Sequence, residues 1–271
     1  MPERAPVLLR VEHLKKVYET AQGRVEAIGD LSFEVRAGEL VCIVGPSGAG
    51  KTTLLKCIAG LLTPTSGTVE LDGVVVTGPP KRMALVFQEY GRSLFPWLTV
   101  AANVGLPLRN RRVPRDVRAA TVERMLATVG LEGQGGKYPW QLSGGMQQRV
   151  AIARAVAYDP EILVMDEPFA AVDAQTRADL EDLVRELWSS LGVTVLFVTH
   201  DIDESVYLGE RVLVLSSAPT FVQEVVEIDL PAVRDQLGTR ADPRFAELRT
   251  RVYQQIQIAK RGPAASTKGE S

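Results

Sequence analysis

One short stretch constrains the fold of this chain more than any other: Gly45-Pro-Ser-Gly-Ala-Gly-Lys51-Thr52. It fits the pattern G-x-x-x-x-G-K-[ST], and a continuous apolar run at 40–44 precedes it. Such a run is typical of a strand buried on both faces. Helical spacing follows, because one face would carry Leu54, Leu55, Ile58, Leu61 and Leu62. A strand, a glycine-rich loop and a helix are the context in which this pattern binds phosphate.

The residue types of this loop suit a nucleoside triphosphate. Glycines let the backbone curl so that successive N–H groups face one anion, and the helix start adds a partial positive charge. Lys51 supplies a point charge, the Thr52 hydroxyl is a ligand for Mg²⁺, and Thr53 can reach a phosphate oxygen. The alternative is a chance glycine turn before a helix. The candidate nucleotide-binding residues are Gly45, Pro46, Ser47, Gly48, Ala49, Gly50, Lys51, Thr52 and Thr53.

A pair of carboxylates follows a second apolar run, where 162–165 leads into Asp166-Glu167-Pro168. An aspartate at the end of a buried strand can hold Mg²⁺ through water, and the adjacent Glu167 is suited to polarise an attacking water. Two surface acids at a strand end are the alternative. Together with Lys51 and Mg²⁺, the pair predicts phosphoryl transfer, in which catalysis is mainly positioning and charge stabilisation.

The rest of the chain predicts alternating strands and helices around a helical block. Strands are predicted at 7–11, 25–33, 67–76, 83–87, 193–198, 211–215 and 221–228. Helices are predicted over 117–129 with Gly130 at the end, over 146–157, over 180–191 before Gly192, and from Asp201, which forms a capping-box-like start with Glu204. The block at about 90–157 contains no predicted strand. Alternation of this kind implies a parallel sheet covered on both faces.

Composition excludes several classes of protein. Of the 271 residues, 45% are hydrophobic and 24% are charged, which excludes a disordered chain. The 31 basic and 33 acidic residues give a net charge of −2, unlike a protein that coats DNA. Cys42 and Cys57 lie in apolar runs and are expected to be reduced and buried. No apolar run is long enough to span a membrane and no secretory signal is visible, so the expected compartment is the cytoplasm.

A third motif identifies a family. The segment Gln141-Leu-Ser143-Gly144-Gly145-Met-Gln147-Gln-Arg149, here the signature loop, resembles the signature of ATP-binding-cassette (ABC) ATPases. From the residues alone it is a second Ser/Gly loop opening a helix, and spacing leaves open whether it serves the same nucleotide as Lys51. The resemblance implies a P-loop NTPase α/β fold with a mainly parallel sheet, an N-terminal antiparallel β-subdomain and an inserted helical subdomain. It implies one ATPase domain over 1–260, with the insertion at about 90–157 and a disordered tail at 261–271.

The resemblance also assigns roles to residues. It implies that Tyr18 stacks on adenine, that Gln88 contacts Mg²⁺ or the attacking water, and that His200 contacts the γ-phosphate. Asp173 would lie in the loop that crosses a dimer interface, and two subunits would pack head to tail around two ATP molecules with Mg²⁺. In that dimer each nucleotide would meet, from the other subunit, Ser143, Gly144, Gly145 and Gln147.

Two further segments narrow the resemblance to the nitrate, aliphatic-sulfonate and taurine importer ATPases: residues 88–100 and 242–249. The expected protein is therefore a peripheral subunit on the cytoplasmic face of the inner membrane. It would work with two transmembrane permease subunits and, indirectly, a solute-binding protein, and no nucleic acid is expected. The run Leu94-Phe95-Pro96-Trp97 either docks a partner helix or fills the local core.

Other functions stay open at this level. The chain could be a soluble ABC ATPase acting on nucleic acid, an ATP-gated regulatory scaffold, or part of an exporter. A basic run either binds nucleic acid or lipid head groups or forms a solvated surface. Its members are Arg109, Arg111, Arg112, Arg115 and Arg118. No segment encodes the solute.

Overall fold

The structure, a computed structural model, describes residues 5–21, 23–88 and 93–261, which form two compact units. Unit 1 combines the described part of 79–198 with 36–40 and with residues 5–6. Unit 2 combines the described parts of 7–35, 41–78 and 199–261. The predicted disorder of the tail falls on residues 262–271, which lie outside the described residues, whereas Arg261 ends a helix.

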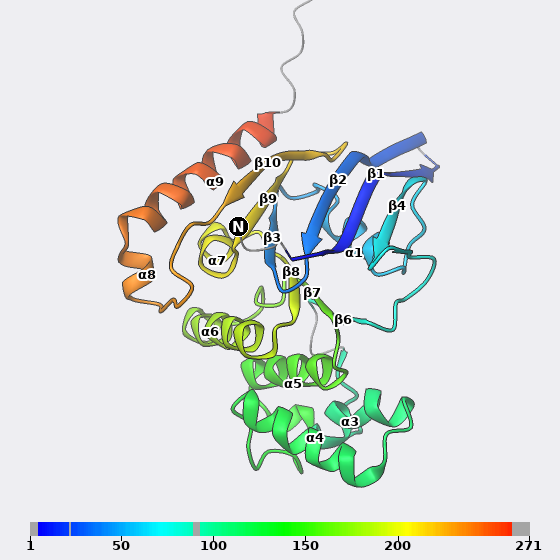
Figure 1. Ribbon diagram of the computed structural model, residues 1–271, viewed down its shortest axis with the longest axis vertical. Coiled ribbons are helices and arrows are strands. Elements are labelled where there is room, and N and C mark those ends of the chain that lie inside the picture. Colours follow the sequence, from blue (N-terminus) through cyan, green and yellow to red (C-terminus); the bar gives the residue numbers. More distant parts are fainter. Residues whose placement is uncertain (1–4, 22, 89–92, 262–271) are drawn as a thin grey trace, which may run out of the picture. The chain divides into compact units, whose positions relative to one another are not determined.

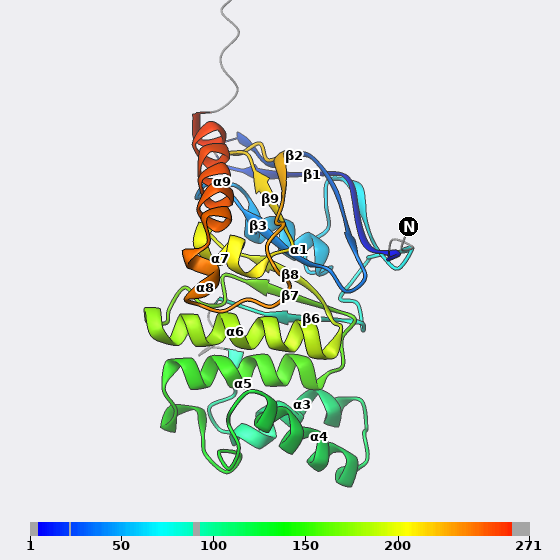
Figure 2. The ribbon, with the colours of Figure 1, turned by 60° about the vertical axis from the view of Figure 1, so that its left-hand side comes forward.

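Unit 1 holds three parallel strands in which β7 pairs with both neighbours. They are β6 (Met83–Val86), β7 (Ile162–Asp166) and β8 (Thr194–Val198). Its helices are α3 (Val100–Asn110), α4 (Arg115–Thr128), the short 3₁₀ helix η1 (Pro139–Gln141), α5 (Gly144–Ala157) and α6 (Ala174–Leu191). Figure 2 shows α5 and α6 side by side, with α3 and α4 beyond α5. The described residues of the predicted helical block contain no strand, as expected.

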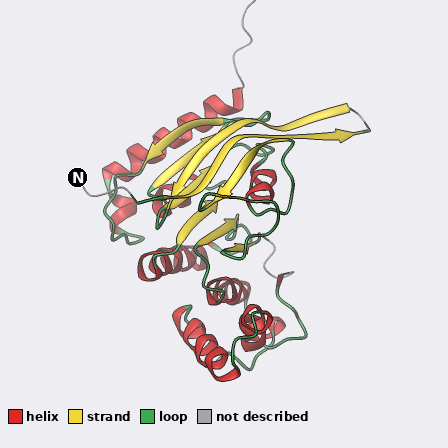
Figure 3. Cartoon of the chain, turned by 45° about the vertical axis from the view of Figure 1, so that its right-hand side comes forward, coloured by secondary structure: helices red, strands yellow, loops and turns green. Residues whose placement is uncertain are grey.

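Unit 2 holds two sets of strands, drawn in Figure 1. In the first, β3 (Leu40–Val44) is parallel to β9 (Arg211–Leu215), which is antiparallel to β10 (Val222–Glu227). The second is a sheet in the order β2 (Gly23–Arg36), β1 (Val7–Thr20), β4 (Ser66–Leu71), β5 (Val74–Val75). The helices are α1 (Lys51–Ile58), α7 (Ile202–Leu208), α8 (Gly238–Ala241) and α9 (Pro243–Arg261). Figure 3 shows β1 and β2 running side by side as long strands.

The architecture is the predicted α/β fold, with parallel strands, an antiparallel N-terminal sheet and a block of helices. Local signals set several helix ends as predicted. Gly130 and Gly192 both follow helices in the left-handed conformation, with φ of 69° and 63°. Asp201 caps α7 by accepting a hydrogen bond from the Glu204 N–H at 3.1 Å. Cys42 and Cys57 are reduced and buried, and burial raises the pKa of the Cys57 thiol.

Several predictions of where an element begins or ends were wrong. The strands predicted at 7–11 and 25–33 are parts of longer strands, β1 and β2, which are hydrogen-bonded neighbours in the sheet. The strand predicted at 67–76 divides into β4 and β5 at a turn, where Asp72 and Gly73 have φ of 50° and 72°. Helix α1 ends at Ile58. Leu61, whose spacing predicted that it belongs to this helix, lies beyond its end and is 51% exposed.

Among the described residues, every helix is too short or too polar to cross a membrane.

Candidate nucleotide site

The phosphate loop (residues 45–52) has the backbone that its glycines predicted. Strand β3 ends at Val44, helix α1 begins at Lys51, and Gly48 and Gly50 have φ of 79° and 71°. A Cβ on Gly50 would lie 2.9 Å from the Ala27 carbonyl oxygen. Gly50 is thus required both for its left-handed conformation and for the space beside Ala27.

Thr220 supports this loop, and sequence reasoning missed it. Its side chain is fully buried, and its Oγ1 lies 2.6 Å from the Ala49 carbonyl oxygen and 2.9 Å from that of Ala27. The hydroxyl therefore joins the phosphate loop to β2. The neighbouring sequence, Ala-Pro-Thr, does not indicate this role, because the Ala49 carbonyl that Thr220 contacts lies 171 residues earlier.

The Lys51 ammonium is held within the loop. The residue is only 8% exposed, and its Nζ donates to the carbonyl oxygens of Gly45 at 3.0 Å and Pro46 at 3.2 Å. Helix α1 starts with no side-chain cap from the described residues and no acidic residue in its first turn. The start of this helix and the lysine place positive charge at one loop, which is suited to a polyphosphate. The side chains of Ser47 and Thr52 are exposed beside it.

In unit 2, Tyr18 lies close to helix α1 and His200 lies close to strand β3, the two elements that flank the phosphate loop. The Tyr18 hydroxyl lies 3.3 Å from the Thr53 Oγ1 in the first turn of α1. The Thr199 N–H donates to the Ile43 carbonyl oxygen at 3.1 Å, so His200 follows directly after a residue paired with β3. His200 is exposed at a cavity of about 570 Å³ that is also lined by Asp201, Ile202, Asp203, Arg249, Thr250 and Tyr253.

The carboxylate pair lies in unit 1 at the end of β7. Asp166 is the last residue of the strand and pairs with Val198 of β8. The Glu167 N–H donates to the Val198 carbonyl oxygen at 2.8 Å, and Glu167 has a φ of 42°. A left-handed conformation is costly for a residue other than glycine, and residues strained in this way occur in turns and cluster at functional sites. The backbone thus holds Glu167 in a strained position beside Asp166.

In unit 1, Thr176 connects the signature loop to Asp173. Ser143 caps α5 by accepting from the Met146 N–H at 3.3 Å, and Gln147 Nε2 donates to the Leu142 carbonyl oxygen at 3.2 Å. Asp173 caps α6 by accepting from the Thr176 N–H at 2.9 Å and the Thr176 hydroxyl at 2.7 Å. These two hydrogen bonds lower the pKa of the Asp173 carboxyl. A Cβ on Gly145 would lie 2.2 Å from Thr176 Cγ2, so α5 and α6 touch at this glycine.

We expect Gly145→Ala to lower the free energy of unfolding by about 1–3 kcal/mol, as overpacking does. The Thr176 methyl group cannot turn away without breaking the hydroxyl bond to Asp173. The double variant Gly145→Ala/Thr176→Ser removes that methyl group, keeps the hydroxyl and should recover most of the loss. Urea unfolding measures both. If the serine gives no recovery, the contact between Gly145 and Thr176 does not set the stability.

The segment after β6 divides between core and surface. Gln88 is exposed two residues beyond β6, and residues 89–92 of the predicted importer-like segment lie outside the described residues. Leu94 is buried, whereas Phe95 and Trp97 are 37% and 71% exposed with ring centroids 5.4 Å apart. Leu94 therefore fills the local core, as one interpretation predicted, whereas docking of a partner helix by the exposed Phe95 and Trp97 stays a prediction.

Asn103, which sequence reasoning also missed, orders this exposed aromatic pair. It is fully buried, accepts from the Phe95 N–H at 2.8 Å, and donates to the carbonyl oxygens of Phe95, Leu98 and Thr99 at 3.1 Å. One side chain thus fixes the backbone on both sides of Trp97.

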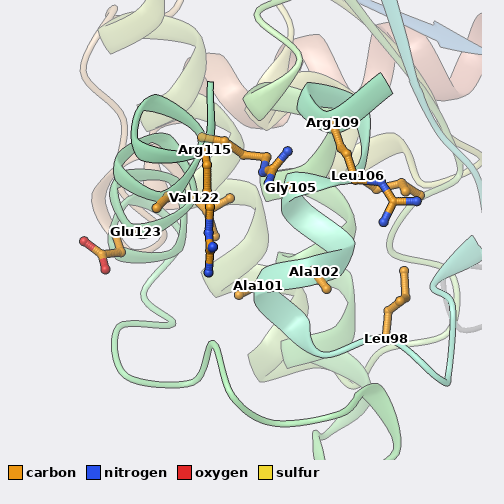
Figure 4. A pocket seen from close by; sticks show the side chains of 11 residues that line it. Leu98, Ala101, Ala102, Gly105, Leu106, Arg109, Arg115, Val122 and Glu123 are labelled. Atoms are coloured by element: carbon orange, nitrogen blue, oxygen red, sulfur yellow. The ribbon is translucent and has the colours of Figure 1, made fainter. Parts of the chain in front are cut away.

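Residues of α3 and α4 line a groove with a volume of about 360 Å³, shown in Figure 4. It is lined by small and apolar residues with three arginines: Leu98, Ala101, Ala102, Gly105, Leu106, Arg109, Arg115, Arg118, Ala119, Val122 and Glu123. Arg111 of the basic run has another role, because its guanidinium lies 3.5 Å from the Tyr158 ring centroid and donates to the Tyr158 and Lys81 carbonyl oxygens.

Comparisons with known proteins agree with these motifs. The family model described as ABC transporter matches residues 28–170. The nitrate import ATP-binding protein NrtD of Synechocystis sp. is 45% identical over 223 residues, which cover 82% of this chain and 83% of that protein. The aliphatic sulfonates import ATP-binding protein SsuB of Bacillus cereus is 39% identical over 249 residues, with 91% and 95% covered. A solved ATP-binding cassette, a dimeric post-hydrolysis state bound to ADP and Pi, has a TM-score of 0.73 and 32% identity, and the match covers 83% of this chain and 100% of that one.

Proposed function

This chain belongs to the ABC transporter family and is an ATP-binding ATPase of that class, and on this premise we propose that it powers a solute importer of the nitrate, aliphatic-sulfonate and taurine type. The phosphate loop carries the nucleotide part of the proposal, because its backbone and the buried Lys51 are suited to a polyphosphate. The importer part is supported by the relatives that are named for import of nitrate and aliphatic sulfonates.

The proposed roles at the nucleotide follow from side-chain chemistry and from the family. Tyr18 stacks on the adenine ring, residues 45–53 hold the phosphates, and His200 contacts the γ-phosphate. Glu167 accepts a proton from the attacking water, a task that an aligned carboxylate performs. Gln88 orients that water.

The ligands proposed for Mg²⁺ are Thr52, Gln88 and Asp166. Hydroxyl, amide and carboxylate oxygens form the hard donor set that Mg²⁺ prefers, together with substrate phosphates. Bound there, the ion would neutralise charge on the phosphate oxygens. The position of Asp166 supports this role, because it is the last residue of β7 and its backbone is held by pairing with β8.

We extend the proposal to a head-to-tail homodimer with two ATP molecules. The solved cassette that this chain resembles is dimeric, which supports the idea. Each ATP would meet, from the other subunit, Ser143, Gly144, Gly145, Gln147 and Asp173. The contact between Gly145 and Thr176 supports a joint role, since it ties the signature loop to the cap that Asp173 forms.

Two permease subunits are the proposed membrane partners, fed by a solute-binding protein. The proposed contact is the α3–α4 groove together with Phe95 and Trp97, which present apolar surface on an ordered segment. Three arginines and one glutamate line the groove, so an apolar helix that carries an acidic residue would complement it. The chain would then lie on the cytoplasmic face of the inner membrane.

Affinity purification from gently solubilised membranes of the host tests this proposal. The tagged wild-type chain should recover a strongly apolar, multi-span protein at about one-to-one stoichiometry. Arg115→Glu/Arg118→Glu should recover at least about tenfold less, because reversed charges repel an acidic helix. Arg124→Glu is the matched control, since Arg124 is exposed on α4 outside the groove, and it should behave as wild type.

Recovery of the wild-type chain with nucleic acid or soluble proteins alone would contradict the importer. Equal loss with Arg124→Glu would contradict the groove as the contact while leaving the importer in place. Thermal melting of each variant confirms that it is folded.

A further inference from the structure

We infer that Lys16 is a positioning residue for the nucleotide base, because its ammonium holds the Tyr18 ring in the orientation that stacks on adenine. The inference rests on the proposed function, in which Tyr18 contacts the base. Lys16, Tyr18 and the residues that contact them all belong to unit 2.

An irregularity in β1 sets the position of both side chains. Glu12 pairs with Thr68 and Lys15 with Ser66, so β1 carries one more residue than β4 between these pairs. His13, within this bulge, has a φ of 47°. A bulge redirects the side chains that follow it. Lys16 and Tyr18, two residues apart on one strand beyond the bulge, then lie on the same face.

The backbone around these two residues is fixed to the segment before β4. The Thr65 N–H donates to the Lys15 carbonyl oxygen at 2.8 Å, and the Val17 N–H donates to Thr65 Oγ1 at 2.9 Å. Thr65 thus holds β1 on both sides of Lys16. With the backbone held in this way, the position of the Tyr18 ring depends on its side-chain contacts, including the one with Lys16.

The Lys16 ammonium has two partners. Its Nζ donates to the Thr63 carbonyl oxygen at 2.8 Å and lies 5.3 Å from the centroid of the Tyr18 ring. A cation at this distance over an aromatic face is attracted by the π-electrons. The hydrogen bond to Thr63 fixes the cation, and the cation in turn fixes one face of the ring.

The edge of the ring is held as well, because the Tyr18 hydroxyl lies 3.3 Å from Thr53 Oγ1. With one face under Lys16 and the hydroxyl at α1, the opposite face is the one that a base can stack on. Thr53 follows Lys51 and Thr52, so the ring is joined to the helix that begins at the phosphates. Lys16 should therefore affect the affinity only for ligands that contain a base, because it acts through the Tyr18 ring.

Affinity for two ligands, ATP and inorganic tripolyphosphate, separates this role from a general loss of structure. We expect Lys16→Met to weaken ATP binding about two- to tenfold and to leave tripolyphosphate binding unchanged. Lys16→Arg keeps a cation and should bind ATP nearly as wild type. In a double-mutant cycle with Tyr18→Leu, Lys16→Met should have no further effect, because its influence passes through the ring.

Several results would overturn the inference. Equal weakening of both ligands by Lys16→Met would mean that the lysine maintains the loop, and additive effects in the cycle would mean that it acts independently of Tyr18. Unchanged ATP affinity in Tyr18→Leu would remove the base contact for both residues. A wild-type chain that fails to bind ATP would instead contradict the proposed function. Melting temperatures of all variants, measured without ligand, confirm that each is folded.

Discussion

Replacing Glu167 by Gln is expected to lower the rate of ATP turnover about 10²–10⁴-fold while ATP affinity stays unchanged. The amide keeps the size of the side chain and loses the ability to accept a proton from the attacking water. Gln has the same difficulty as Glu with the φ of 42° at this position, so the change leaves the backbone strain as it was. Steady-state phosphate release and equilibrium ATP binding measure the two quantities separately.

Two further variants make this test specific. Glu186→Gln changes an exposed glutamate on α6 and should keep the wild-type rate. Glu167→Gly relieves the left-handed backbone, so it should be folded at least as well as Glu167→Gln and be equally inactive. Substantial hydrolysis by Glu167→Gln would remove this residue from the role of base and leave the phosphate loop unaffected.

Lys51→Met is expected to reduce ATP turnover about 10²–10³-fold and also to weaken ATP binding about tenfold or more. The methionine retains most of the apolar stem but removes the charge that the loop holds near the phosphates. In the free protein the change also leaves the Gly45 and Pro46 carbonyl oxygens without this donor. A modest loss of stability should therefore accompany the loss of binding.

The matched control is Lys56→Met, which removes an exposed lysine from the last turn of the same helix. It should bind and hydrolyse ATP as the wild type does. If Lys51→Met kept its affinity for ATP and lost only turnover, the lysine would act on the transition state alone. If it kept both, the proposal that residues 45–53 hold the phosphates would fail.

Local sequence patterns predicted the elements that carry most of the candidate residues. The limits of β3, the start of α1, and the glycines that end α4 and α6 all agree with the sequence. Such features depend on backbone preferences within a few residues, so short segments encode them. Element lengths were predicted less well, because pairing within a sheet extended β1 and β2 beyond their apolar runs.

The residues that sequence reasoning missed act over long separations. Thr220 binds the phosphate loop from 171 residues away, and Lys16 donates to a carbonyl 47 residues later. Asn103 is nearer to its partners, but its role depends on a buried hydrogen-bonding position that brings its side chain to the backbone of Phe95. A single buried threonine or asparagine has no pattern that distinguishes it from the many others with ordinary roles.

The sequence by itself determined which motifs this protein carries: the phosphate loop, the carboxylate pair and the signature loop are contiguous, and each is recognisable without its neighbours. Only the tertiary structure decided how these parts are supported. Gly145 meets Thr176, Thr220 meets Ala49, and Lys16 meets the Tyr18 ring because folding brings distant segments into contact. The physical reason is the separation along the sequence over which each kind of interaction acts. Backbone conformation and charge are properties of a few adjacent residues, whereas close packing and buried hydrogen bonds depend on which segments the fold places together.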